Sequence, residues 1–232
     1  MSAPARIARL GAYAAAACLL AACANNPPTP DWQLNVKSGL DHAVEAWLAG
    51  NTGIESQEFA GVRSAIARTG RPALLARAEL VRCASRVASL EIGECEGYRP
   101  LAADAEPVER AYAAYLAGRA GPPDVPLLPE QHRAIAAATT APPSDLAALD
   151  RMTDPLARLV GASVLLQTGR GSPAVVARAV ESASAQGWRR PLLAWLQVQL
   201  RQTEASGDQP SVDRIRRRIA LVEGGAAAPR SP

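Results

Sequence analysis

Aromatic residues are scarce in this 232-residue chain, at 4% of the total, and Phe59 is the single phenylalanine. Lys37 is the single lysine, so arginine carries nearly all of the positive charge. Alanine, by contrast, is abundant. Sheet sandwiches and barrels are enriched in β-branched and aromatic residues. A chain with few aromatics and many small side chains is therefore expected to be all-α, with closely packed helices.

Long apolar runs are also missing. The apolar stretch at residues 10–20 is about half of the roughly 20 residues that a membrane-spanning helix needs. It follows Arg6 and Arg9, with no acidic residue before Asp31, and it ends in small residues directly before Cys23. A positive region, a short apolar region and small residues, in that order, are typical of an export signal. We expect residues 1–22 to be a signal peptide that is removed.

The segment LAAC at residues 20–23 resembles a bacterial lipobox. The resemblance implies cleavage before Cys23, a diacylglyceryl group on its thiol and acylation of the new amine. Two or more acyl chains make membrane anchoring stable. Ala24 stands where an aspartate is associated with inner-membrane retention, which implies the outer membrane, facing the periplasm. Residues 23–31 then form a lipidated, proline-stiffened tether. The alternative is an ordinary signal peptide followed by a structural cysteine.

The charge balance becomes almost neutral once the signal is removed. The whole chain has 25 basic and 22 acidic residues, and loss of Arg6 and Arg9 reduces the basic count to 23. Nucleic-acid binding depends on a basic surface. We therefore expect no nucleic-acid partner.

The cysteines suggest one structural bond. Removal of the signal and lipidation of Cys23 leave Cys83 and Cys95, twelve positions apart. Two cysteines in an oxidising compartment favour a disulfide, which stabilises by about 3 kcal/mol in the chain-entropy model. The alternative is a metal pair completed by His42 or His132, but nothing in the sequence places either histidine nearby. We predict the disulfide, and no metal or other cofactor.

Glycine and proline mark helix boundaries throughout the chain. Glycines follow periodic apolar stretches, and prolines begin the segments after them, as at Gly70 and Pro72. Glycine just past a helix end and proline in the next first turn are typical of real helices. No stretch shows sustained strand alternation. The expected helices span residues 33–49, 54–69, 72–89, 106–118, 129–139, 144–151, 154–168, 172–186, 189–206 and 210–223.

These helices are expected to form hairpins in two groups. Residues 32–120 would hold the first hairpins and a disulfide loop, and residues 130–223 the second group. The segment at 121–129, GPPDVPLLP, reads as a proline-rich connector and a candidate hinge. Residues 224–232 are expected to be a disordered tail. The fold class is thus stacked helical hairpins, as an α-solenoid or an irregular bundle.

One internal repeat supports the stack. The segment AVEAWLAG at 43–50 aligns without gaps on AYAAYLAG at 111–118. The offset of 68 residues is twice the 34-residue period of tetratricopeptide repeats, and Phe59 falls where such a repeat places a large residue. The chain therefore resembles degenerate tetratricopeptide-like lipoproteins of Gram-negative outer membranes. That resemblance implies docking of other envelope proteins, whereas two unrelated alanine-rich helices that end alike are the alternative.

Catalytic patterns are sparse. Neither histidine belongs to a metal-protease or nucleophile-elbow motif, and we expect no catalytic residue. Glu91, Glu94 and Glu96 cluster beside Cys95. Paired carboxylates could cleave glycosidic bonds, so a peptidoglycan hydrolase is the enzymatic alternative, although three loop glutamates usually form a solvated loop.

The last expected helix carries a basic face. Arg214, Arg217 and Arg218 lie off its apolar stripe. Either they are solvated, with local pairs such as Asp213 to Arg217, or they bind an anionic lipid, glycan or partner. The sequence thus favours a membrane-anchored helical adaptor for another envelope protein, with a concave surface expected along helices 33–49 and 106–118. An anionic lipid- or glycan-binding module is a further alternative.

Overall fold

The computed structural model describes residues 29–138 and 144–224 and is all-helical over these ranges. Within these ranges, the residues from Asn35 onward form one compact unit. The helices are α2 (Asp31–Ala49), α3 (Thr52–Ala67), α4 (Pro72–Ala88), α5 (Pro107–Leu116), α6 (Glu130–Ala137), α7 (Ser144–Arg151), α8 (Pro155–Gln167), α9 (Pro173–Ala185), α10 (Arg189–Ser206) and α11 (Gln209–Gly224), with short 3₁₀ turns η1 (Arg99–Leu101) and η2 (Val125–Leu127). The predicted all-α class is confirmed. Within the described ranges, no helix is both long and apolar enough to cross a membrane.

The helix boundaries follow local chemistry. Gly50 and Gly207 adopt φ of 97° and 77° directly after α2 and α10, a left-handed conformation that glycine adopts without steric cost. Proline occupies the first turn of α4, α5, α8 and α9. Asp154 caps α8, because its side chain accepts from the Leu156 N–H at 2.9 Å. Ser172 caps α9 by accepting from the Val175 N–H at 3.4 Å. These local signals explain why most boundaries agree with the sequence prediction within two residues.

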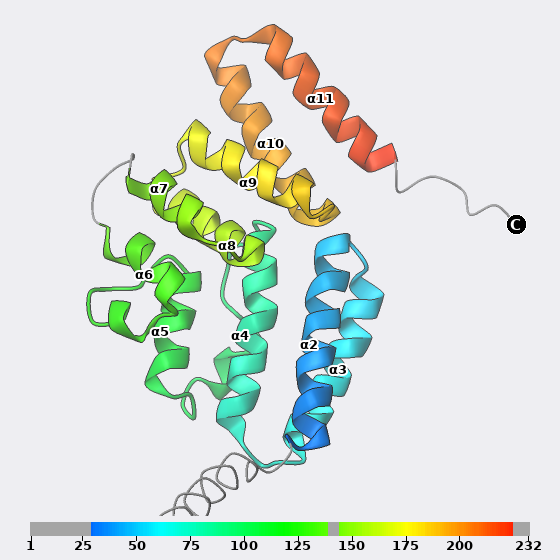
Figure 1. Ribbon diagram of the computed structural model, residues 1–232, viewed down its shortest axis with the longest axis vertical. Coiled ribbons are helices and arrows are strands. Elements are labelled where there is room, and N and C mark those ends of the chain that lie inside the picture. Colours follow the sequence, from blue (N-terminus) through cyan, green and yellow to red (C-terminus); the bar gives the residue numbers. More distant parts are fainter. Residues whose placement is uncertain (1–28, 139–143, 225–232) are drawn as a thin grey trace, which may run out of the picture. The chain divides into compact units, whose positions relative to one another are not determined.

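Helix α8 is the centre of the compact unit. It packs against α4, α5, α6, α7 and α9, and Figure 1 shows α8 beside the end of α4. A Cβ atom on Gly161 would lie 2.7 Å from Ile135 Cδ1 and 3.1 Å from Leu149 Cδ2. The missing side chain therefore lets α6 and α7 approach α8 closely. Helices α8 to α11 pack in chain order, as antiparallel neighbours.

The core is continuous across the proline-rich connector. One cluster of buried apolar residues extends from Trp47 to Ile219 and includes Leu128 in the connector, which is 1% exposed. The Asp124 carboxylate accepts from the Gly121 N–H at 2.8 Å, and η2 packs against α5 and α6. The connector is thus a packed element of the unit. A smaller cluster joins α2, α3 and α4 around Phe59.

Helix α2, near the start of the compact unit, contacts the residues at the start of α10, near its end. The Trp188 indole N–H donates to Glu45 Oε2 at 3.1 Å. Arg190 donates to the Trp47 carbonyl at 2.8 Å, and its guanidinium lies 3.8 Å from the centre of the Trp47 ring. Arg86 of α4 lies over the same ring at 4.3 Å. Cation–π contacts therefore join α2, α4 and α10 around one tryptophan.

The two repeated segments have matching environments. Trp47 and Tyr115 are 4% and 0% exposed, and the leucine that follows each is buried. Gly50 and Gly118 both have positive φ after their helices. The repeat therefore reflects two helices that bury the same positions and end in the same way. The apolar residues at the end of α2 are packed into the core, so this face of α2 is not an open concave surface.

Candidate functional site

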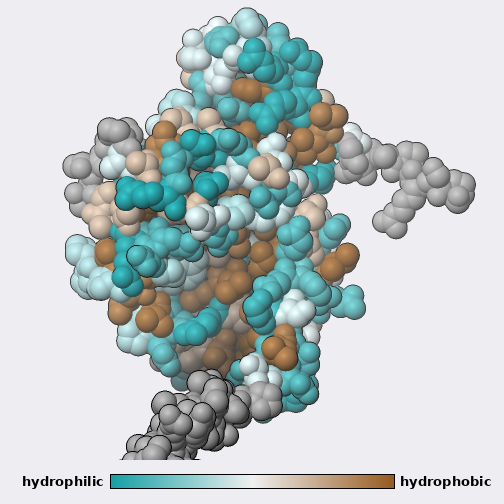
Figure 2. All heavy atoms as spheres, in the orientation of Figure 1, coloured by the Kyte–Doolittle hydropathy of each residue, from teal (hydrophilic) through white to brown (hydrophobic). Residues whose placement is uncertain are grey.

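An apolar groove of about 510 Å³ lies between α4, α5 and the η2 turn. Leu80 and Val81 of α4 form one wall, and Val108 and Tyr112 of α5 form the other. On the face seen in Figure 2, apolar side chains gather in a hollow over α4. The exposed fractions of Val108 and Leu127 are 37% and 38%, which is high for large apolar residues. This groove combines apolar walls with exposed large side chains, and it is our candidate site.

Local sequence explains how the groove is built. The core face of α4 runs through Leu80, Ala84 and Val87, so Val81 falls at the edge of that face and stays partly exposed. Val108 and Tyr112 are four residues apart on α5, and residues at this spacing share a helix face. Asp124 directly precedes η2, and its backbone carbonyl accepts from the Leu127 N–H at 2.9 Å, which helps to place Leu127 on the third side.

An ion pair lies within the groove. Arg77 donates through Nη2 and Nε to Glu109 Oε1 at 2.7 and 2.9 Å, and both residues line the groove. Glu109 is 4% exposed. Its second oxygen, Oε2, is buried and has no hydrogen-bond partner among the described residues. A buried acceptor without a donor costs free energy of folding, and a ligand that brings a donor would remove that cost. The groove thus combines apolar walls, a neutralised charge and one available acceptor.

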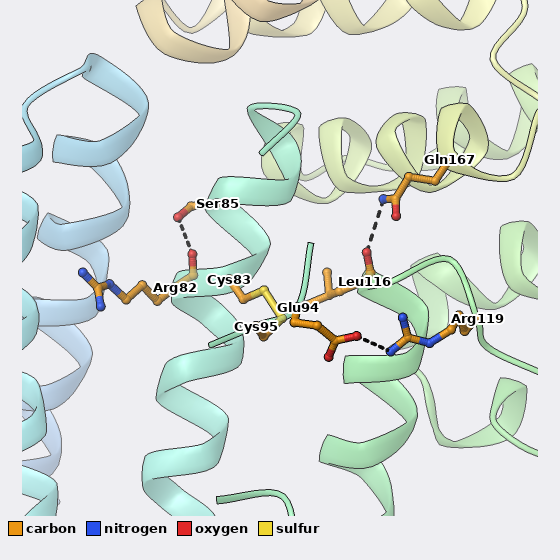
Figure 3. Close-up of a disulfide and its surroundings, with 8 residues drawn as sticks. All are labelled: Arg82, Cys83, Ser85, Glu94, Cys95, Leu116, Arg119 and Gln167. Atoms are coloured by element: carbon orange, nitrogen blue, oxygen red, sulfur yellow. Dashed lines mark hydrogen bonds and ion pairs between the residues drawn. A yellow bond between two sulfur atoms is a disulfide. The ribbon is translucent and has the colours of Figure 1, made fainter. Parts of the chain in front are cut away.

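Cys83 and Cys95 form a disulfide, with Cα atoms 5.6 Å apart, as predicted for the two cysteines that remain after Cys18 and Cys23 are accounted for. Figure 3 shows that this bond joins α4 to the loop before η1. Glu94 of the same loop lies 3.2 Å from Arg119, just after α5, so the loop is held at two points. Arg82 points away from the disulfide, toward α2 and α3.

The direction of Arg82 is explained by a buried carboxylate on α3. Glu55 is 1% exposed and lies 2.5 Å from Arg82 Nε and 3.5 Å from an Arg86 nitrogen. Burial alone would raise the pKa of Glu55, but the hydrogen bond from Arg82 and the charges of both arginines outweigh it and lower that pKa. Glu55 is thus an ionised structural group that joins α3 to α4.

The loop glutamates line a polar hollow of about 630 Å³ beside the disulfide. Glu94 is 62% exposed beside Arg119, and Glu91 is 51% exposed and 3.8 Å from Arg190. Glycosidic cleavage requires an acid shielded from water and a carboxylate opposite it. The buried carboxylate of this hollow, Glu79, is instead paired with Arg63. The hollow gives no geometric support to the hydrolase alternative.

No family model, curated protein or solved structure matches the chain. The described residues contain no group of three or more histidine, cysteine or acidic side chains arranged to hold a metal. Cys83 and Cys95 are oxidised to the disulfide and offer no thiolate ligand. Cys23 lies outside the described residues, so its predicted lipidation stays a prediction.

The two histidines lie in different settings. His42 is exposed on α2, 4.0 Å from Glu58. His132 is 2% exposed, and its Nδ1 lies 3.1 Å from the Tyr115 hydroxyl. Burial lowers the pKa of His132 from 6.5 to about 4, so its imidazole is neutral near pH 7. His132 is therefore a core residue that partners Tyr115.

A larger hollow, of about 930 Å³, lies beyond the connector between α5, α6 and α8. Arg170 lines it but already donates to the carbonyls of Ile135 and Ala138 and to Asp145. Arg133 lines it too and donates to the Leu128 carbonyl. These arginines hold the walls of the hollow together, so we do not assign it a ligand.

The predicted arginine face lies on α11. Arg214 and Arg217 are exposed, and Arg218 is partly buried. The prediction of an Asp213–Arg217 pair is wrong. Asp213 Oδ1 instead accepts from Gln209 at 2.9 Å and lies 4.0 Å from an Arg216 nitrogen. Spacing alone allowed both i+3 and i+4 partners, and only the side-chain geometry separates them.

Sequence reasoning did not find the groove. Helix 106–118 was expected to line a concave surface, and α5 does line the groove, but Arg77 and Glu109 are 32 residues apart and no motif joins them. One signal was present in the connector. Leu127 and Leu128 are apolar residues in a segment otherwise typical of a linker, which indicates that the segment packs against the fold.

Proposed function

We propose that this chain is a lipid-anchored adaptor of the cell envelope, held by Cys23 on the periplasmic side of the outer membrane. Its groove between α4 and α5 takes a short apolar segment of another envelope protein. The observation that carries the proposal is the groove itself, with Val108 and Leu127 exposed beside a buried carboxylate oxygen that lacks a donor. The hairpin organisation and the repeated segments at 43–50 and 111–118 are in keeping with a degenerate tetratricopeptide-like adaptor.

Charge defines the kind of segment that fits. Arg77 neutralises Glu109, so the groove offers no free charge to a charged ligand. Its walls are apolar, and its volume of about 510 Å³ is in the range of pockets that hold small ligands or a few side chains. An uncharged apolar segment therefore matches the groove better than an acidic or basic one.

Glu109 Oε2 adds a requirement for a donor. A peptide in extended conformation presents backbone N–H groups beside its side chains. One N–H donated to Oε2 would satisfy the buried acceptor while apolar side chains fill the groove. An acyl chain would fill the same volume but would leave the carboxylate oxygen without a partner, so the proposal is a peptide segment.

Site-specific photocrosslinking in the native envelope tests the groove. A benzophenone amino acid at position 108 or 127 should form an adduct with one protein, and mass spectrometry should place the crosslink in an apolar segment of that protein. With the benzophenone at position 108, Leu127→Asp should weaken binding of the segment by on the order of 100-fold and reduce the adduct accordingly, because binding would then desolvate an unpaired charge.

Ile54→Asp is the matched control, because Ile54 is 54% exposed and does not line the groove. It should leave the adduct unchanged. Equal loss in both variants, adducts with lipid alone, or a crosslink map spread over many proteins would each overturn the groove assignment.

The anchor has its own test. Cys23→Ser should accumulate as the longer precursor and lose the mass of the acyl groups, because the thioether needs a thiol. Normal maturation of this variant would refute lipidation and leave the groove experiment unaffected.

A further inference from the structure

Helix α11 presents a second surface that differs in chemistry from the groove. It packs on α10 through its buried residues Val212, Ile215 and Ile219. In Figure 1 α11 is the outermost helix of the C-terminal hairpin, lying beside α10. Its basic face consists of Arg214, Arg217, Arg218 and Leu221, which recur at intervals of three and four residues and therefore share one side of the helix.

The arginines of the basic face are not neutralised by neighbours. Among the described residues, none of the three takes part in an ion pair or a side-chain hydrogen bond, whereas Arg216 on the next face lies 2.8 Å from Glu204. Asp213 is engaged by Gln209 and Arg216. Asp208, just before α11, accepts from the Ser211 N–H at 3.2 Å. Hydrogen bonds from Ser211, with a smaller effect of the Arg214 charge, lower the pKa of that carboxyl, but Asp208 and Arg214 form no ion pair. The basic face therefore keeps its positive charge.

Leu221 indicates what kind of anion fits this face. Its side chain is 75% exposed, the highest value among the large apolar residues of the described chain. A soluble phosphate or an acidic glycan would use the arginines but would gain nothing from an exposed leucine. A phospholipid surface uses both, because guanidinium groups reach headgroup phosphates while apolar side chains enter the acyl boundary.

We propose that the basic face of α11 binds the anionic phospholipid surface of the membrane to which the chain is anchored. The proposal rests on the proposed Cys23 anchor for the location of that membrane. Contact through α11 would add a second attachment to the lipid anchor. It would also fix the orientation of the helical unit on the bilayer, which attachment at Cys23 alone does not set.

Arginine footprinting on the lipidated protein tests this contact. The protein is reconstituted in vesicles of phosphatidylcholine, with or without phosphatidylglycerol, and treated with phenylglyoxal. Mass spectrometry then gives the modification rate of each arginine. Three arginines at an anionic surface favour the bound orientation by on the order of 100-fold. Arg214 and Arg217 should therefore react several-fold more slowly on the vesicles that contain phosphatidylglycerol.

Arg68, Arg71 and Arg201 are the internal controls, because they are exposed and form no ion pair within the described residues. Their rates should not depend on lipid composition. Protection of the basic face should disappear at an ionic strength of about 1 M, where the Debye length is about 3 Å. Leu221→Asp should also abolish it, whereas Ile54→Asp, with the same change of charge, should not.

Three results would overturn the lipid contact. The first is an equal rate for Arg214 and Arg217 on both kinds of vesicle. The second is an equal slowing of all the exposed arginines, which would indicate diffuse attraction. The third is equal protection by soluble glycerol phosphate or cell-wall fragments, which would identify an anion rather than a membrane. Failure of the anchor is distinguishable, because an unlipidated protein would not associate with vesicles of phosphatidylcholine alone.

Discussion

Arg170 Nη1 lies 3.2 Å from Asp145 Oδ1, and the Asp145 side chain is 1% exposed. The same guanidinium donates to the Ile135 carbonyl at 2.8 Å and the Ala138 carbonyl at 2.9 Å. One arginine after α8 therefore holds the end of α6 and the start of α7. Removing one partner of a buried pair leaves an uncompensated charge, which is more costly than losing the pair.

Arg170→Met should lower the free energy of unfolding by about 3–5 kcal/mol, because Asp145 is left buried and unpaired. Urea unfolding followed by circular dichroism measures the change. The double variant Arg170→Met/Asp145→Leu should recover part of the loss. Arg178→Met is the matched control, since the pairs of Arg178 with Asp150 and Glu181, both at 2.7 Å, are partly exposed and should each contribute no more than about 1 kcal/mol. Similar losses in the two single variants would contradict the buried-pair interpretation.

Cys83→Ala/Cys95→Ala should lower the free energy of unfolding by about 3 kcal/mol, because the disulfide closes a loop of twelve positions. The measurement is urea unfolding with and without dithiothreitol. Reductant should shift the wild type to the stability of the double variant and leave the variant unchanged. A wild type insensitive to complete reduction would show that the loop is held by Glu94–Arg119 and its packing instead.

His132 should make the protein less stable in mild acid. The pKa of His132 is 6.5 in the unfolded chain and about 4 in the folded protein. Between these pH values the unfolded chain therefore binds a proton at this histidine and the folded chain does not. Stability should therefore fall as the pH drops from about 6.5 to about 4, by about 3 kcal/mol in total. The Tyr115 hydroxyl and the Tyr112 ring contact the imidazole, and only Asp154 favours its protonation.

His132→Leu should remove this part of the pH dependence, and His42→Leu, at the exposed histidine, should not. Chemical denaturation at a series of pH values gives both slopes. An unchanged slope in His132→Leu would assign the acid sensitivity to the carboxylates.

A double-mutant cycle tests the bond between Trp188 and Glu45. Trp188→Phe and Glu45→Met should each remove the hydrogen bond and destabilise the fold, and the two effects should be less than additive. The coupling energy should be about 0.5–1.5 kcal/mol, as for an ordinary hydrogen bond. Additive effects in urea unfolding would mean that the indole N–H contributes nothing to the link between α2 and α10.

The helices could be predicted because their signals are local. Helices α7 and α10 begin and end at the predicted residues, and Ser172 caps α9 directly before its predicted proline. A left-handed glycine or a first-turn proline acts within a few residues of the boundary that it sets. The disulfide could be anticipated for a similar reason, since elimination left only two cysteines to pair.

The groove and the buried ion pairs could not be predicted, because they depend on which helices meet. Glu109 is one of several acidic residues at helix starts, and nothing in its neighbourhood indicates that Arg77 will cover it. Leu90, with φ of 61°, is the only non-glycine residue of the described chain at positive φ. Leu90 follows the Ser89 C-cap of α4, and the Glu91 N–H donates back to the Arg86 carbonyl at 3.0 Å. It thus takes the left-handed conformation that glycine usually adopts at this position, so its residue type gave no signal.

The contacts around Trp47 also have a consequence for the order of folding. Arg190 and Trp188 are each 143 residues away in the chain from the α2 groups that they bind. Contacts between groups so far apart in the chain form only after a large loop has closed, which slows folding. Until that loop closes, the Trp47 ring has no C-terminal helix to cover it. The packing of α10 on α2 is therefore the step of folding that is most exposed to misassembly.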